Sequence, residues 1–169
     1  MRRLWHDPRE ILSPHVREGM TVLEPGPGMG FFTLELLRLT SPSGRVVAVE
    51  IQPRMLVVLK RRAAKAGLLD RLDARLAQPD SMRLVGLDGA ADFALAFAMV
   101  HELPAAGPFF AEISRALKPR AHLLLAEPVG HVKPAEFEVE LRQAASAGLV
   151  LVDRPTIRRS ETALLEKTS

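Results

Sequence analysis

The sequence predicts an α/β protein built on one doubly wound, mainly parallel sheet, and three observations support this prediction. Apolar runs rich in β-branched residues alternate along the chain with segments of helical periodicity. Several of these runs end at a carboxylate or a glycine-rich turn, as strands do where a parallel sheet meets a ligand. The last two runs are joined without an intervening helix, which predicts an antiparallel pair at the end of the chain.

Length and composition are those of one globular domain. With 169 residues, 47% of them hydrophobic and 25% charged, the chain is long enough to bury a core. We divide it into a short N-terminal preamble, residues 1–19, and one domain, residues 20–169. The absence of cysteine excludes disulfides, thiolate metal sites and cysteine nucleophiles, and it fits a cytoplasmic protein.

Charge and hydropathy exclude further classes of partner. No apolar run approaches the roughly 20 residues of a membrane span, so we expect no membrane partner. The net charge is only +3, and the basic residues are scattered apart from Lys60-Arg61-Arg62 and Arg158-Arg159. Because no basic stripe is interleaved with aromatic residues, we expect no nucleic-acid partner either.

The first strand, turn and helix form the segment on which the rest of the chain is organised. An apolar strand from residue 21 ends at the carboxylate of Glu24, and a helix follows from Phe31. Between them lie three glycines without Cβ atoms, which let a ligand approach the backbone closely: Gly26, Gly28 and Gly30. We interpret this segment as a small-molecule site at the carboxyl end of the first strand.

The second strand supplies another carboxylate. It covers residues 45–50 and ends at Glu50, 24 positions after Gly26. This is close to the roughly 20 positions expected for an acidic residue that binds a ribose. A helix then runs from Pro53 to Gly67, and an alternating segment, residues 72–77, predicts the third strand.

The second half of the chain continues the same alternation. A fourth strand, residues 91–98, runs into a polar segment, and a helix over residues 109–117 is stopped by Lys118-Pro119. The remaining predicted elements are a strand at 121–126, a helix at 134–147, and the antiparallel strands 149–153 and 162–166.

Four of these segments, in this order, resemble the class I S-adenosylmethionine-dependent methyltransferases, and the small-molecule group described as UbiE-like in particular. They are residues 22–30, 49–50, 97–103 and 112–119. The resemblance spans residues 20–168 and implies a Rossmann-like sheet of seven strands in the order 3-2-1-4-5-7-6, with strand 7 antiparallel. It departs from the family at Arg120, where members usually have glycine, so we expect the turn there to be different or slightly strained.

The resemblance also implies the cofactor, the reaction and the residues that serve them. The cofactor would be S-adenosylmethionine, and the reaction a methyl transfer by in-line displacement to a small-molecule acceptor. Glu50 would bind the ribose hydroxyls, Asp80 the adenine amino group, and Glu24 the methionine ammonium. The full set of implied cofactor-binding residues is Glu24, Gly26, Pro27, Gly28, Gly30, Phe31, Glu50, Ile51, Asp80, Ser81, Met82 and Ala98.

A base assists methyl transfer when the acceptor carries a proton. The best candidate is His101, at the tip of the fourth strand, with a packing role as the alternative. Glu102, Glu127 and His131 are candidates for the lining of the acceptor pocket. We expect no metal site, since no partner at metal-ligand spacing accompanies His6, His15 or His122.

Two other functions compete with this interpretation. A nicotinamide-dependent oxidoreductase would need its third fingerprint glycine where Phe31 stands, and the antiparallel final pair also argues against it. A non-catalytic module or regulatory subunit that binds S-adenosylmethionine would retain the same carboxylates and glycines. Few residues lie outside the core fold, so either the pocket is open to a large or bound partner, or residues 1–19 and a second subunit cover it. We expect a homodimer.

Overall fold

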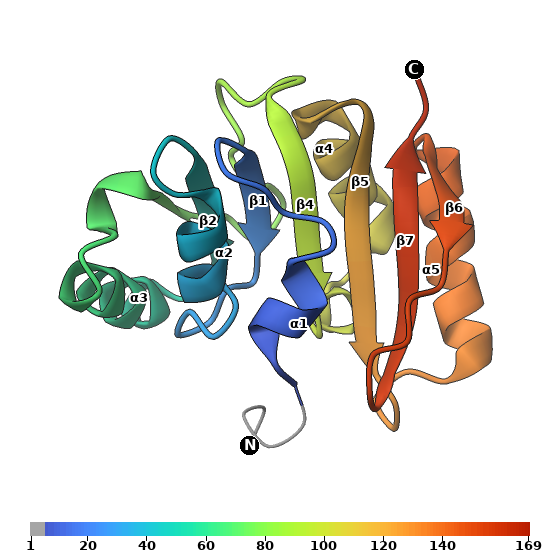
Figure 1. Ribbon diagram of the computed structural model, residues 1–169. Coiled ribbons are helices and arrows are strands. Elements are labelled where there is room, and N and C mark those ends of the chain that lie inside the picture. The colour runs from blue at the N-terminus through green and yellow to red at the C-terminus, as the bar shows by residue number, and fades with distance from the viewer. Residues whose placement is uncertain (1–5) are drawn as a thin grey trace. The chain divides into compact units, whose positions relative to one another are not determined.

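The computed structural model describes residues 6–169, so the first five residues of the predicted preamble lie outside the described part (Figure 1). Across this part the strands form a seven-stranded sheet in the order β3-β2-β1-β4-β5-β7-β6. β7 (Ser160–Lys167) is antiparallel to both β5 (Leu117–Pro128) and β6 (Leu149–Asp153). The predicted fold class, strand order and antiparallel strand are therefore confirmed.

The chain divides into two compact units, Asp7–Arg83 and Leu84–Ser169, the second of which also includes His6. The first unit contains three parallel strands, β1 (Thr21–Pro25), β2 (Arg45–Glu50) and β3 (Leu72–Leu76). β1 and β2 are almost entirely buried because both faces of a parallel strand are covered, which explains their continuous apolar sequence.

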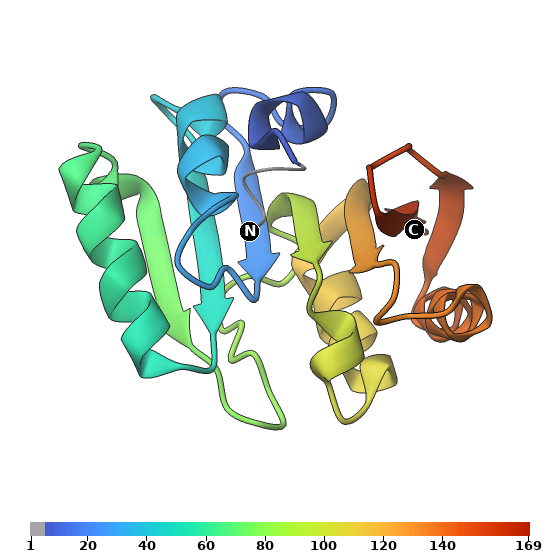
Figure 2. The same cartoon turned by 90° about the horizontal axis from the view of Figure 1, so that it is seen from below.

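Helices cover these strands. The first unit contains α1 (Pro8–Leu12), α2 (Thr33–Thr40), α3 (Pro53–Lys65) and the short 3-10 helix η2 (Leu69–Arg71). α2 packs over β2 and contacts α1, and α1 and α2 lie on the same side of the strands in Figure 2. α3 packs along β3, where Leu56 and Leu59 form a core cluster with Ala48 of β2. The predicted bounds of β2 and the predicted start of α3 are confirmed.

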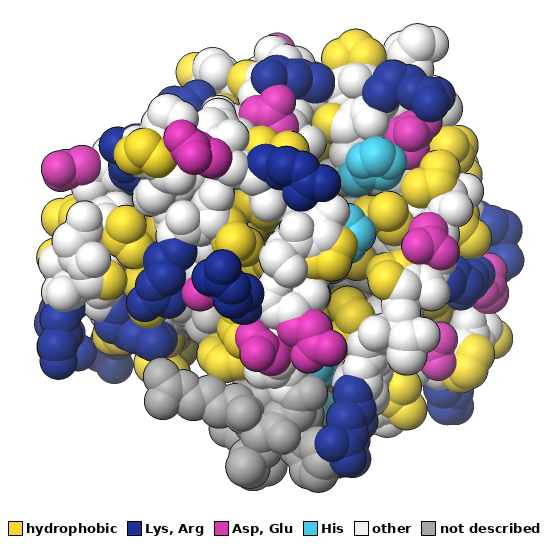
Figure 3. Space-filling model, viewed as in Figure 1, with side chains coloured by type: hydrophobic (Ala, Val, Ile, Leu, Met, Phe, Trp, Pro, Cys, Tyr) yellow, Lys and Arg dark blue, Asp and Glu magenta, His cyan; other side chains and the backbone are white. Residues whose placement is uncertain are grey.

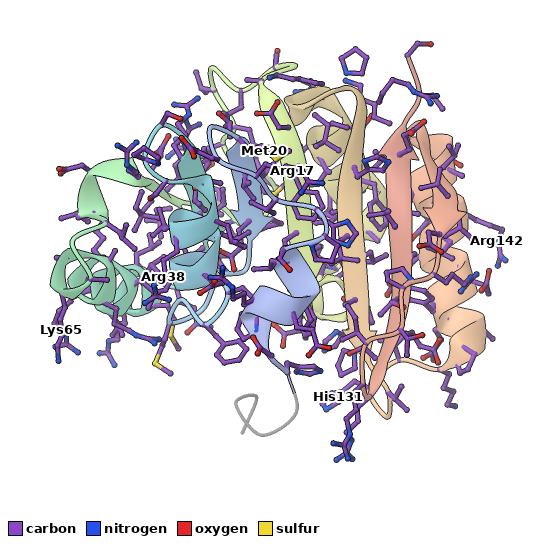
Figure 4. The ribbon with its side chains drawn as sticks, viewed as in Figure 1. Arg17, Met20, Arg38, Lys65, His131 and Arg142 are labelled. Carbon is purple, nitrogen blue, oxygen red and sulfur yellow. The ribbon has the colours of Figure 1, made fainter. Side chains whose placement is uncertain are left out.

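A close backbone approach joins α2 to the strands. The Gly44 N–H donates to the carbonyl oxygen of Thr40 at 2.8 Å, and the Arg45 N–H donates to that of Met20 at 3.0 Å. A Cβ atom on Gly44 would lie 2.4 Å from the Met20 carbonyl oxygen. Met20 and Arg17 sit together just before β1 in Figure 4, where the Arg17 N–H donates to the Met20 sulfur at 3.3 Å. Position 44 therefore requires glycine, because any Cβ atom there would clash with the Met20 carbonyl oxygen.

The second unit contains four strands and two long helices. β4 (Ala91–Phe97) pairs in parallel with β5, and β5 pairs with β7. α4 (Ala106–Ala116) and α5 (Pro134–Ser146) contact each other and lie on the same side of β4, β5 and β7 in Figure 2. The buried face of α4 carries Phe109, Phe110 and Ile113.

Two element boundaries differ from the sequence prediction. α4 begins at Ala106, three residues earlier than predicted, because Pro108 falls in the first helical turn, where its missing N–H costs nothing. β5 begins at Leu117, before the Lys118-Pro119 pair, and its pairing with β4 shifts register between Ala91 and Phe93. Arg120 lies in this irregularity with φ +67°, so the departure expected at this position is a strained backbone within β5 and not a turn.

Candidate functional site

The glycine turn connects β1 to α2 in the first unit, and its glycines have different tasks. Gly28 has φ +56°, and a Cβ atom there would meet no atom within 4 Å, so the backbone borders open space. Gly30 has φ +87°, and its Cβ atom would lie 2.4 Å from Cδ1 of Leu59 on α3. Gly30 thus allows close helix packing, whereas Gly28 leaves the space beside its Cα open to a ligand.

Glu50, at the end of β2, is bonded directly to the glycine turn. Its Oε2 accepts a hydrogen bond from the Gly28 N–H at 3.1 Å, and its Oε1 accepts one from the Gln52 N–H at 3.0 Å. Glu50 is only 7% exposed. A carboxylate offers about four lone-pair positions, so two remain for further donors. The structure therefore joins the two motifs that the sequence related only by spacing.

Glu24 is buried at the end of β1, and its Oε2 accepts a hydrogen bond from the hydroxyl of Thr33 at 2.6 Å. Thr33 is the first residue of α2 and is fully buried. A carboxylate at a helix N-terminus is also favoured by the helix dipole. Sequence reasoning missed Thr33, although a hydroxyl residue in the first helical turn after the glycines was a usable signal.

Thr33→Val is expected to lower the free energy of unfolding by about 1–3 kcal/mol, because the buried Glu24 carboxylate loses a donor while the side-chain shape is kept. Urea denaturation measures this change. Thr33→Ser is the matched control, since it restores the hydroxyl. Equal losses in both variants would show that the methyl group, and not the hydrogen bond, is responsible.

The residues assigned to the adenosine side follow β2 and β3. Ile51 is 51% exposed next to Glu50, which leaves an apolar surface beside the carboxylate. Asp80 is exposed in a turn closed by paired backbone hydrogen bonds between Gln78 and Ser81, at 2.8 and 3.3 Å. Met82 is buried two residues later. In the glycine turn itself, Pro27 is buried and Phe31 is half-buried, with its ring in a T-shaped contact with that of Phe32.

The second unit holds the remaining predicted residues, Ala98 and His101. Ala98, just after β4, has φ +55°, which is unusual for a residue other than glycine, and its N–H donates to the Ala126 carbonyl at 2.7 Å. His101 lies in the 3-10 helix η3 (Val100–Glu102). Its Nδ1 is hydrogen-bonded to Oε2 of Glu127, at the end of β5. The structure thus pairs two candidates that the sequence placed 26 positions apart.

Glu127 is fully buried and holds the start of η3. Its Oε1 accepts hydrogen bonds from the Val100 N–H at 2.9 Å and the Met99 N–H at 3.3 Å. The ring of His131 lies 5.5 Å from that of His101, centroid to centroid, and comes from the loop after β5, at the position labelled in Figure 4. Oε1 of the exposed Glu102 lies 4.0 Å from Nε2 of His101.

Glu140 is a further buried carboxylate that sequence reasoning missed. It lies on the buried face of α5 beside Phe137 and Leu141, and its Oε2 has no hydrogen-bond partner. Burial, the charge of Glu127 and the charge of Glu136 together raise the pKa of Glu140 from 4.5 to about 7. A glutamate on an otherwise apolar helix stripe was the signal that would have identified it.

This pKa predicts how stability depends on pH. The pKa of Glu140 is raised in the folded state, so the folded protein binds more protons than the unfolded chain between about pH 4.5 and 7. The stability of the fold therefore falls as the pH rises across that window. Glu140→Gln removes this loss. Relative to wild type, the variant is expected to gain about 2 kcal/mol of unfolding free energy between pH 4.5 and pH 8. Glu138→Gln, exposed on the same helix, is the control in urea titrations at both pH values. A gain that does not change with pH would contradict the assignment.

No group of three or more His, Asp or Glu side chains in residues 6–169 is arranged to hold a metal ion. No helix in the described part of the chain is long and apolar enough to cross a membrane.

The sequence model described as "Methyltransferase domain" matches residues 22–120, more than half of the chain. The chain belongs to the class I S-adenosylmethionine-dependent methyltransferases. The predicted family, enzyme class and cofactor are therefore confirmed.

Two curated relatives match parts of this methyltransferase. It is 29% identical over 129 residues to the ubiquinone/menaquinone biosynthesis C-methyltransferase UbiE of Brucella canis, covering 75% of this chain and 47% of that protein. It is 40% identical over 62 residues to the mitochondrial ribosomal RNA small subunit methyltransferase of Arabidopsis thaliana, covering 37% of this chain and 16% of that protein. The chain thus spans about half or less of the length of these relatives.

Solved structures show the same fold. A methyltransferase from Aquifex aeolicus that depends on S-adenosylmethionine superimposes with a TM-score of 0.84 at 24% identity, covering 98% of this chain and 91% of that one. An O-methyltransferase from Thermotoga maritima superimposes with a TM-score of 0.76 at 17% identity, covering 96% of this chain and 65% of that one. At these identities the likeness concerns the fold, which does not by itself identify the methyl acceptor.

Proposed function

We propose that this methyltransferase transfers the methyl group of S-adenosylmethionine to a small-molecule acceptor. The observation that carries the proposal is the fixed Glu50 carboxylate beside Gly28. Its two unused lone-pair positions suit the two vicinal hydroxyls of a ribose, and the Gly28 backbone borders open space. The residues present therefore fit the cofactor of the family.

We assign the cofactor's two ends to opposite sides of the glycine turn. Glu50, Ile51 and the segment from Asp80 to Met82 serve the adenosine end, with Ile51 covering one face of the adenine. The methionine end is assigned to the glycines Gly26, Gly28 and Gly30 and to Glu24, Pro27, Phe31 and Ala98. The burial of Glu24 and its hydrogen bond from Thr33 support this assignment, because a fixed carboxylate binds an ammonium without first losing side-chain freedom.

When bound, S-adenosylmethionine supplies a methyl group that its positive sulfur has already activated. The protein then needs no nucleophile of its own, and its residues act by binding, by orienting the acceptor and by excluding water. We assign His101 as the group that takes a proton from the acceptor.

Two observations support a small molecule over RNA as the acceptor. The likeness to UbiE, a biosynthetic C-methyltransferase, covers three quarters of this chain, whereas the likeness to the ribosomal RNA enzyme covers 37%. On the face shown in Figure 3, Lys and Arg side chains are interspersed with acidic and hydrophobic ones and form no continuous basic stripe. We also propose a homodimer, which light scattering tests.

The test has two stages. Calorimetric titration is expected to show binding of S-adenosylmethionine and no binding of NAD. A panel of phenols, amines, thiols and a short RNA hairpin then follows, with release of S-adenosylhomocysteine as the readout. Tight cofactor binding without turnover of any acceptor would favour a non-catalytic binding module. Turnover of the RNA alone would contradict the small-molecule acceptor.

A further inference from the structure

The two ring nitrogens of His101 have different surroundings. Nδ1 is hydrogen-bonded to Oε2 of Glu127, while Nε2 has the exposed Glu102 carboxylate as its neighbour at 4.0 Å. An ionised carboxylate can only accept, so Nδ1 donates to Glu127. In the neutral imidazole the lone pair is then on Nε2. One hydrogen bond thus selects the atom of His101 that can accept a proton.

Glu127 is well suited to hold this tautomer. It is fully buried at the end of β5, and Oε1 accepts two backbone N–H groups from the start of η3. These two bonds hold the carboxylate in place independently of His101. The imidazole is therefore oriented by a carboxylate that cannot rotate away. The positive φ of Ala98 turns the chain out of β4 just before this segment.

We propose that Glu127 positions His101 as the proton acceptor of the reaction, with Nε2 as the accepting atom, and that the methyl acceptor is a nucleophile that must lose a proton. This inference rests on the proposed function and names the class of acceptor: a hydroxyl compound or a protonated amine. Acceptors that carry no such proton, for example thioethers and tertiary amines, would not need this pair.

The step balances in atoms and charge. The electron pair of the acceptor atom forms the bond to the methyl carbon, and the pair of the former carbon–sulfur bond stays on sulfur. The acceptor proton moves to Nε2, which turns the neutral imidazole into an imidazolium. The Glu127 carboxylate stabilises that positive charge, and the proton passes to water after the transfer.

Four charged or titratable groups surround the pair. Glu102 faces Nε2, and the ring of His131 lies beside that of His101. Glu140 of α5 and Glu161 of β7 complete the set. The charge of Glu127 contributes to the raised pKa of Glu140, and Glu161 lies opposite Glu127 in the strand register. Because the rings of His101 and His131 lie side by side, the tautomer of His101 has to be followed at its own resonances.

The first experiment needs no cofactor. Nitrogen-15 NMR of the imidazole resonances is expected to show His101 in wild type with Nδ1 protonated and Nε2 unprotonated. In Glu127→Gln this tautomer preference is lost, because the side-chain amide no longer offers a carboxylate acceptor to Nδ1. Glu161→Gln is the control, because Glu161 lies opposite Glu127 in the β5–β7 register and should leave the tautomer unchanged. The opposite tautomer in wild type, or an unchanged tautomer in Glu127→Gln, would overturn the proposal.

The second experiment uses turnover. Glu127→Gln and His101→Gln are expected to lower kcat about 100-fold or more for a phenol or an ammonium acceptor, with unchanged calorimetric affinity for S-adenosylmethionine. Glu127→Asp should recover part of the loss. At alkaline pH, where a phenol is already ionised, the defect should shrink. An equal defect with a thioether acceptor would show a merely structural role. Loss of cofactor binding in wild type would refute the proposed function instead, while the NMR result would stand.

Discussion

Replacing Glu50 with alanine is expected to weaken the binding of S-adenosylmethionine about 10- to 100-fold. The carboxylate can accept two hydrogen bonds from the ribose, and each contributes a net of about 0.5–1.5 kcal/mol, because water replaces the lost partner. Each 1.4 kcal/mol corresponds to a tenfold change in affinity. The variant also removes the acceptor for the Gly28 N–H, so the glycine turn loses its link to β2. Calorimetric titration measures the change.

Two controls separate the ribose contact from general damage. Glu18→Ala removes an exposed glutamate from the same unit and should bind the cofactor like wild type. Glu50→Gln keeps a carbonyl acceptor and should fall between wild type and Glu50→Ala. The ribose assignment is wrong if Glu50→Ala binds within a factor of two of wild type.

Gly44→Ala is expected to lower the free energy of unfolding by about 3 kcal/mol, the largest effect on stability that we predict. The new Cβ atom would lie 2.4 Å from the carbonyl oxygen of Met20 and 2.7 Å from that of Thr40. Both neighbours are backbone atoms engaged in hydrogen bonds that join α2 to the strands, so no side chain can rotate to make room. Overpacking of this kind typically costs about 1–3 kcal/mol and sometimes more. Urea denaturation of the variant and wild type measures the loss.

Gly107→Ala provides the matched control. It makes the same chemical change in the first turn of α4, where a Cβ atom would meet nothing within 4 Å. Because alanine favours the helix over glycine, this variant should gain about 0.5–1 kcal/mol. If the two variants were equally stable, the close approach at Gly44 would not be what requires glycine there.

The agreement between sequence and fold is greatest where one local pattern decides an element. The bounds of β2 follow from its buried β-branched run, and α3 starts at the proline that fits a first helical turn. The start of β5 could not be predicted, because Lys118-Pro119 stops a helix but is tolerated at an irregular strand start. There the register shift against β4 and the positive φ of Arg120 accommodate it.

By itself the sequence determined the order of the elements, the glycine turn and the two carboxylates at strand ends, and with them the family and its cofactor. These features are local, since periodicity and turn chemistry act over a few residues. Only the tertiary structure decided how the buried polar groups pair: Glu50 with the Gly28 N–H, Glu24 with Thr33, and His101 with Glu127. Each pair joins two elements of secondary structure. A buried polar group needs a hydrogen-bond partner, and strand register and helix packing decide which partner lies within reach. For this reason the glycine turn pointed to the cofactor from the sequence alone, whereas the pairing of His101 with Glu127 became evident only from the fold.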